Sequence, residues 1–305
     1  MYDESVAAGD GTLPSKPLLS VLCLTYNHER FLAQALESML MQRTNFQFEV
    51  VVGEDFSNDA TAKVLERYAA HYPDKIKPLW TTVNLGMVEN MRRTQALCRG
   101  RYIAICEGDD YWVDPYKLQK QVDFLEENAE YVLCFHDAVT LREGKLDHRP
   151  QLGRRFRREA SARELTAGRP ISTLTVCYRN VLKDIPIQFD RVPMLDICLW
   201  SLLGQYGKGA YLSDITPAVY RAHQGGAVSS QSEGRRFRMA MATSSILSNY
   251  WDTQGKREAA KLTAFSSVFY GVCQLQFSDL TKIAAFALAM PIVRNVLRVF
   301  RGRRI

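Results

Sequence analysis

A turn that holds three carboxylates and a glycine is the part of this sequence best suited to chemistry. Glu107, Gly108, Asp109 and Asp110 directly follow the apolar run 102–106, which has the composition of a strand buried on both faces of a sheet. Carboxylates this close repel one another unless a cation shares them, and oxygen ligands suit Mg²⁺ or Mn²⁺ better than Zn²⁺. The turn therefore predicts a divalent metal site, with a helix-capping polar turn as the alternative.

Two more polar clusters follow apolar runs in the first half of the chain. Tyr26 and Asn27 follow the run 18–25, and Glu54 and Asp55 follow a run that begins at Phe48. Parallel strands place such residues at one edge of a sheet, where α/β proteins bind ligands. A tyrosine that stacks on a base, acids that accept its hydrogen bonds and a metal that bridges two phosphates would suit a nucleoside diphosphate. The alternatives are a core tyrosine and a capping turn.

The elements that must position these clusters alternate along the chain. The predicted strands and helices of the first half are, in order, 18–25, 29–41, 48–52, 59–70, 76–80, 88–98, 102–106 and 115–128. Strands that alternate with helices through short connections predict an α/β fold. Its central sheet should be mainly parallel, with right-handed crossovers and helices on both faces.

The second half of the chain is less regular. Its predicted strands and helix are 131–135, 173–178, 215–221 and, for the helix, 194–206. The basic segment 141–158 is expected to be a mobile loop, and everything after Ser232 reads as helical. We expect a disordered lead-in over 1–16, a catalytic domain over 17–230 and a helical region over 231–305.

The net charge of +6 is concentrated in two arginine clusters, one over 149–158 and one over 294–304. Local charge of this kind favours a binding face for phosphates or acidic lipid, and no nucleic-acid-binding module is visible, so no nucleic acid partner is expected. The seven cysteines show no CxxC spacing, and the N-terminus lacks the pattern of a signal peptide. We therefore expect a cytoplasmic protein with reduced thiols.

Read in order, these motifs resemble the GT-A glycosyltransferases of family 2. The segments that carry the resemblance, which is dense over 17–125, are SVLCLTYN (20–27), EVVVGEDFSNDAT (49–61), NLGMVENMRRTQALCRGRYIAICEGDDYW (84–112) and Pro115, Lys117, Leu118 and Gln121. The usual DDGSxDGT motif stands here as EDFSNDAT, and the usual DxD metal motif as Glu107-Gly108-Asp109. Phe56 in place of glycine, and Glu107 in place of aspartate, depart from the family pattern.

The resemblance implies a GT-A fold with a helical C-terminal extension, a donor half over 17–125 and an acceptor half over 126–230. It implies that a nucleotide sugar binds in the donor half, with UDP as the expected nucleotide. The implied donor-binding residues are Thr25, Tyr26, Asn27, Glu54, Asp55, Asn84, Arg92, Arg93, Glu107, Gly108 and Asp109. Mn²⁺ or Mg²⁺ would be held by Asp109 and by His223, which lies in a segment similar to the later YR-H-GG motif of the family.

The acceptor half should supply a general base, because the attacking sugar hydroxyl must lose its proton. Asp196 is an isolated carboxylate at the start of an apolar helix, where loss of solvent raises a carboxyl pKa. Its alternative role is a first-turn acid that stabilises the helix dipole. Asp190 is the second candidate for the base.

These observations predict a metal-dependent inverting glycosyltransferase that acts on a glycan or lipid-linked glycan, in bacterial surface polysaccharide synthesis. The alternative is a nucleotide-sugar-binding protein without catalytic activity. At the C-terminus, residues 283–293 carry no charge but are too few to span a bilayer. The arginines that follow alternate with apolar residues, which predicts a basic amphipathic helix in peripheral contact with the inner face of the cell membrane.

Overall fold

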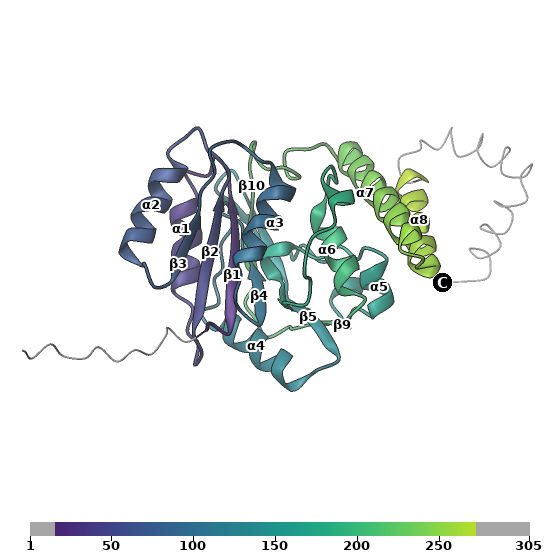
Figure 1. The fold of residues 1–305 in the computed structure, drawn as a ribbon, viewed down its shortest axis with the longest axis horizontal. Helices are drawn as coiled ribbons and strands as arrows, with labels where there is room; N and C mark the ends of the chain where they lie inside the picture. Colours follow the sequence, from purple (N-terminus) through teal and green to yellow (C-terminus); the bar gives the residue numbers. More distant parts are fainter. Residues whose placement is uncertain (1–15, 273–305) are drawn as a thin grey trace, which may run out of the picture.

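The computed structural model describes residues 16–272, and its main sheet has the strand order β3-β2-β1-β4-β8-β5-β9 (Figure 1). The strands are β1 (Leu19–Thr25), β2 (Phe48–Glu54), β3 (Ile76–Leu79), β4 (Tyr102–Ile105), β5 (Tyr131–Phe135), β8 (Cys177–Arg179) and β9 (Lys208–Tyr211). The first four are mutually parallel, β8 runs antiparallel to both of its neighbours, and β9 is parallel to β5. The predicted mainly parallel sheet is confirmed.

Helices cover both faces of this sheet, because successive side chains of each strand point to opposite faces. The helices are α1 (Leu32–Leu40), α2 (Thr61–His71), α3 (Met87–Leu97), α4 (Lys117–Glu127), α5 (Ala162–Thr166), α6 (Leu195–Leu203), α7 (Glu233–Thr253) and α8 (Arg257–Val272). Leu22 and Ile103 belong to a core shared with α3 and α6. Val21 and Tyr102 belong to the core on the other face, shared with α1 and α4.

A second, smaller sheet corrects the expectation of a loop over 141–158. It has the order β10-β6-β7, formed by β6 (Ala138–Arg142), β7 (Lys145–Asp147) and β10 (Ala218–Ala222). Strands β6 and β7 are a hairpin whose turn residues, Glu143 and Gly144, have φ angles of 51° and 75°. β7 has only three residues and is mostly exposed, and only the first two residues of β6 are buried, so no apolar pattern revealed the hairpin.

Three arginines of this region, Arg149, Arg157 and Arg158, pair with acids of the same chain. Arg157 lies 2.9 Å from Asp137, and Arg158 lies 2.5 Å from Glu164. A short 3-10 helix, Arg154–Phe156, lies beside them. The predicted strand over 173–178 is also shorter than expected, because a 3-10 turn, Thr173–Thr175, precedes β8.

The last described elements, α7 and α8, form a helical hairpin beyond α6 (Figure 1). Trp251 anchors α7 to α6 by donating a hydrogen bond from its ring nitrogen to Ser201 (3.0 Å). The helical extension is confirmed up to residue 272. Most of the predicted lead-in, and the predicted basic tail, lie outside the described residues. Within 16–272, no helix combines the length and the apolar character needed to cross a bilayer.

Candidate active site

The turns that follow β1, β2 and β4 lie at one edge of the main sheet. Backbone hydrogen bonds join them, since Asp55 N donates to Thr25 O (3.1 Å) and Gly108 N donates to Leu24 O (2.9 Å). The three strands are parallel neighbours, so their carboxyl ends meet. The structure therefore brings together the residues that the sequence predicted in these three turns.

In the turn after β2, the carboxylates accept hydrogen bonds from the protein backbone. Glu54 accepts from the N–H groups of Phe56 (3.1 Å) and Ser57 (2.8 Å). Asp55 accepts from the N–H groups of Leu85 (2.8 Å) and of the glycine after it (2.9 Å), at the start of α3. Both acids are buried. They hold the turn and the start of α3 in place, and a hydrogen bond to a nucleotide base would be additional to these.

Two further predicted donor residues brace the same turn. Asn84 donates from its side chain to the carbonyl of Asp55 (3.0 Å). Arg93 donates to the carbonyl oxygens of Glu54 (2.5 Å) and Trp80 (2.9 Å), and so ties the end of β2 to the end of β3. In this structure Asn84 and Arg93 support the turn that carries the acids.

The turn after β1 presents one exposed and one buried polar side chain. Tyr26 is 42% exposed, as a ring that stacks on a ligand would be, whereas Thr25 is buried and its hydroxyl has no hydrogen-bond partner within the described residues. A Cβ atom at Gly108 would lie 2.7 Å from that hydroxyl, so glycine lets the two turns approach. Asn27 adopts a φ of 56° and accepts a hydrogen bond from Asn58 N (3.0 Å).

The turn after β4 buries its carboxylates close to one another. Burial raises the pKa of Glu107 to about 7, against the effect of a hydrogen bond from Thr173. The charges of Asp109 and Asp196 raise that pKa further. Burial, and then repulsion by Asp109, also raises the pKa of Asp110. One oxygen of Glu107 is buried without a hydrogen-bond donor in the described part of the chain.

Asp109 faces two histidines. Its Oδ2 atom lies 3.0 Å from Nε2 of His223 and 3.7 Å from Nε2 of His28. One ligand atom from each of the three residues lies within 4.8 Å of the others, so the group could hold a metal ion. Burial raises the pKa of Asp109, but His223 and His28 outweigh it and lower the pKa below its usual value. Burial lowers the pKa of His28 and so favours the neutral, metal-binding ring.

Arg221, for which the sequence suggested no role, braces this turn from β10. Its backbone N–H donates to Asp110 (2.8 Å), and its guanidinium donates to the carbonyl of Asp109 (2.6 Å). The guanidinium also lies over the ring of Tyr111, 4.5 Å from its centroid. The YR-H-GG segment of the sequence was a signal for this residue, but only the structure shows its contacts.

A cavity of about 1060 Å³ opens beside the histidines. Three segments line it: the turn after β1, the tip of the β6–β7 hairpin and the residues after β10. His28 and His223 face this cavity, together with Arg30 and Arg142. It is large enough for a small-molecule ligand. Such a ligand would meet basic side chains and also the metal-type cluster, which is the group of His28, Asp109 and His223.

Asp196 lies in the first turn of α6, as predicted. Burial raises its pKa to about 6, opposed by hydrogen bonds from the backbone. Its charge also raises the pKa of Glu107, so the two carboxyl groups lie within electrostatic range of each other. A carboxyl group with this pKa is deprotonated at neutral pH and can accept a proton.

The second candidate for the base, Asp190, is engaged elsewhere. It is exposed and lies 2.6 Å from a guanidinium nitrogen of Arg92. Arg92 also pairs with Glu89 and donates to the carbonyl of Ile185 (3.0 Å). Arg92 therefore joins α3 to the segment before α6, and Asp190 belongs to this ion pair.

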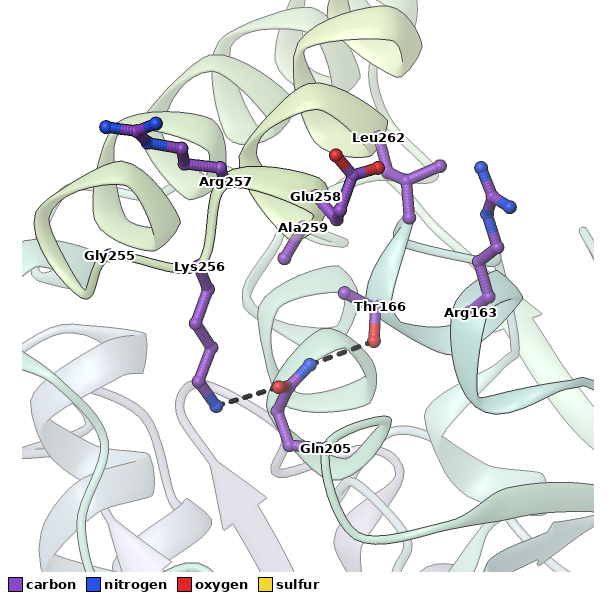
Figure 2. A pocket seen from close by; sticks show the side chains of 9 residues that line it. All are labelled: Arg163, Thr166, Gln205, Gly255, Lys256, Arg257, Glu258, Ala259 and Leu262. Atoms are coloured by element: carbon purple, nitrogen blue, oxygen red, sulfur yellow. Dashed lines mark hydrogen bonds between the residues drawn. The ribbon is translucent and has the colours of Figure 1, made fainter.

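A second cavity, of about 470 Å³, lies among the helices of the second half, and none of its lining residues is a predicted site residue (Figure 2). In it, Lys256 donates to Gln205 (2.7 Å), which in turn donates to Thr166 (3.0 Å), as the dashed lines in Figure 2 show. These three side chains already form hydrogen bonds with one another, and none of them was predicted to bind a ligand. We therefore place the candidate active site at the edge of the main sheet and not in this cavity.

Solved structures define the class to which this fold belongs. A mannosyltransferase of Pyrobaculum calidifontis is 16% identical, with a TM-score of 0.60, over 92% of this chain and 83% of that one. TarS of S. aureus is 17% identical, with a TM-score of 0.58, over 83% of this chain and 71% of that one. The mainly parallel sheet with helices on both faces is that of GT-A glycosyltransferases.

The family model for glycosyl transferase family 2 matches residues 20–185. The chain therefore belongs to that family, and it is a glycosyltransferase, which favours the predicted enzyme over a protein that only binds nucleotide sugars. The matched range contains the three turns but ends before Asp196 and His223.

Curated relatives agree with this assignment. The uncharacterized protein Rv1520 of Mycobacterium tuberculosis is 35% identical over 259 residues, which cover 83% of this chain and 69% of that protein. EpsE of Bacillus subtilis is 38% identical over 117 residues, which cover 38% of this chain and 41% of that protein, and carries a glycosyltransferase name.

His28 is the residue of the metal-type cluster that sequence reasoning missed. Its signal was its position, directly after Tyr26 and Asn27 at the carboxyl end of the first strand. Position alone could not show that its ring turns toward Asp109, because that depends on the packing of β1 against β4.

Proposed function

We propose that this protein is a metal-dependent, inverting glycosyltransferase that uses a UDP-sugar and transfers the sugar to a hydroxyl group of a glycan or lipid-linked glycan. One observation carries the proposal. Asp109 lies 3.0 Å from His223 and 3.7 Å from His28, and both histidines line the same cavity. A donor diphosphate would bind in that cavity, and the charge of Asp196 acts on Glu107 in the same turn as Asp109.

The residues present fit a divalent cation. Asp109 and His223 offer an oxygen and a nitrogen that already lie 3.0 Å apart. Ligands at right angles around an ion with bonds of about 2.1 Å are separated by about 3 Å. Bound there, Mn²⁺ or Mg²⁺ would neutralise the charge of the departing diphosphate as a Lewis acid.

The chain's own residues would carry out the remaining steps. Tyr26 would stack on the base, and Glu54 and Asp55 would keep the base-binding turn rigid. Asp196 would accept the proton of the acceptor hydroxyl as that oxygen attacks the anomeric carbon from the face opposite the diphosphate. A single displacement of this kind inverts the anomeric configuration.

The choice of nucleotide and pathway rests on similar proteins. TarS has been solved with UDP-GlcNAc and with UDP, and the mannosyltransferase with GDP-Man and Mn²⁺. TuaG of Bacillus subtilis, 29% identical over 142 residues, which cover 45% of this chain and 54% of that protein, carries a teichuronic acid biosynthesis name. These likenesses support a UDP-sugar donor and a role in bacterial surface polysaccharide synthesis.

Thermal unfolding with a panel of nucleotide sugars tests the donor. A ligand at one hundred times its Kd stabilises the native state by about 2.7 kcal/mol. We expect one UDP-sugar to raise the Tm with Mn²⁺ and to lose that effect in EDTA. A panel in which no nucleotide sugar changes the Tm, with or without metal, would contradict the proposal.

We also propose that the enzyme works in the cytoplasm, at the inner face of the membrane, where a lipid-linked acceptor would be found. The support is the sequence of the tail, whose five arginines over 294–304 alternate with apolar residues. Sedimentation with anionic vesicles at low salt should remove the full chain from solution but leave a chain that ends at residue 281. Equal sedimentation of the two chains would exclude the tail as the anchor.

A further inference from the structure

We propose that His28 is a third protein ligand of the divalent cation, which makes a two-histidine, one-carboxylate site that favours Mn²⁺ over Mg²⁺. This inference rests on the proposed metal dependence and adds a ligand and a metal preference to it. Neither the acidic turn nor the family match pointed to His28, which lies 81 residues before Asp109 in the sequence.

The backbone of His28 is held on two sides, which fixes the position from which its ring projects. Its N–H donates to the hydroxyl of Thr61 (2.7 Å), at the start of α2. Its carbonyl accepts from the N–H groups of Phe31 and Leu32 (2.9 Å each), at the start of α1. A ring mounted on such a rigid turn does not need to move to bind an ion.

The ring nitrogen of His28 that can act as the ligand is Nε2. It lies 3.7 Å from Oδ2 of Asp109, which is beyond hydrogen-bond distance, so an ion can lie between the two atoms. Nδ1, on the opposite side of the ring, is buried without a hydrogen-bond partner within residues 16–272, and a Cβ atom at Gly108 would lie 3.0 Å from it. The ring of His223 meets that of His28 edge to face, with centroids 6.1 Å apart, so both imidazoles converge on one carboxylate.

This ligand set has a chemical consequence. Mg²⁺ binds oxygen ligands almost exclusively, whereas imidazole nitrogen suits transition metals. Two nitrogens and one carboxylate oxygen leave the other positions around the ion for the diphosphate and water. His28 and His223 line the large cavity, from which those oxygens would approach.

The test measures metal binding without nucleotide, so that it does not depend on turnover. Free Mn²⁺ is measured by electron paramagnetic resonance as metal-free protein is titrated. We expect His28→Gln to weaken Mn²⁺ binding at least tenfold, on the scale of changes around metal ligands. The matched control is His71→Gln, at the exposed end of α2, which should bind Mn²⁺ as the native protein does.

A second variant tests the preference. His28→Asp replaces the nitrogen by oxygen, so Mg²⁺ should displace Mn²⁺ from it at a severalfold lower concentration than from the native protein. Native-like Mn²⁺ binding by His28→Gln, or the same Mg²⁺ competition in His28→Asp, would overturn the proposal. A failure of the proposed metal dependence would give a different result from a failure of this inference. The native protein would then transfer sugar undiminished in EDTA.

Discussion

In the turn after β2, the carboxylates of Glu54 and Asp55 each accept two hydrogen bonds from backbone N–H groups. In the turn after β4, Glu107 keeps a buried oxygen without a donor in the described residues, and Asp109 faces two histidine rings. Both turns are acidic and end parallel strands at the same edge. Acids that accept backbone hydrogen bonds support the structure, whereas a buried acid without a donor and an acid that faces two histidines are suited to a cation.

The largest effect is expected at Asp109, the carboxylate that faces the histidines. Asp109→Asn keeps the shape but removes the charge that would hold the cation. Metal-dependent donor binding should be lost and turnover should fall about 10²- to 10³-fold, the scale of losing one electrostatic stabiliser. Steady-state kinetics with Mn²⁺ and thermal unfolding measure this, and the Tm should not fall. Undiminished turnover of this variant in EDTA would contradict the proposal that the turn after β4, unlike the turn after β2, binds a cation.

Asp196 should give the next largest effect. Asp196→Asn should lower kcat about 10²-fold or more and leave donor affinity unchanged, because the side chain acts on the acceptor proton. Asp190→Asn is the matched control, since Asp190 is paired with Arg92 and should matter little. Loss of donor affinity with a normal kcat would instead mean that Asp196 has a structural role.

The opposite pattern is expected at Asp55, in the satisfied turn. Asp55→Asn replaces two charge-assisted hydrogen bonds by one neutral bond and turns an NH₂ group toward a backbone N–H. The free energy of unfolding should fall by about 2 kcal/mol. Calorimetry should show a Tm lower by about 4–8 °C. If Asp55→Asn were as stable as Asp109→Asn, the two turns would not differ in the way proposed here.

The pKa of Asp196, raised to about 6, predicts two effects of pH. The base works deprotonated, so kcat should rise with pH, with a midpoint near 6. Because the pKa is above its unfolded value of about 3.9, the fold binds this proton more tightly, and its stabilising effect is lost as pH rises through 6. Asp196→Asn should therefore exceed the native Tm at pH 8 but not at pH 4. Parallel Tm curves for the two proteins would contradict this.

The smallest effect is expected at Phe56, the exposed residue of the satisfied turn. It has a φ of 59°, a left-handed conformation that costs a side chain about 1–2 kcal/mol. Such strain persists mainly where it serves a site, and an aromatic contact with a base contributes about 1–3 kcal/mol. Phe56→Gly should weaken donor binding about fivefold by calorimetric titration without lowering the Tm. If Phe56→Gly bound the donor with unchanged affinity, the left-handed backbone at Phe56 would have no role in donor binding.

The first half of the fold could be predicted from the sequence because its signals are local. An apolar run of five residues and a helix of three turns each leave a pattern within a short window, so β1 to β4 and α1 to α4 appeared within a few residues of their observed bounds. The polar strand ends then implied one edge, since parallel strands share a direction. Asp196 was placed at a helix start by the same kind of local pattern.

What the sequence could not determine depends on which distant segments pack together. The short hairpin of β6 and β7 and the antiparallel β8 are set by their neighbours in the sheet. The resemblance implied that Asp109 and His223 bind one metal, but the contact of His28 with Asp109 spans 81 residues, and no local pattern states it. The two acidic turns also look alike as sequence. Only the tertiary structure brings the start of α3 to Asp55 and the histidines to Asp109, because hydrogen-bond partners are assigned by packing.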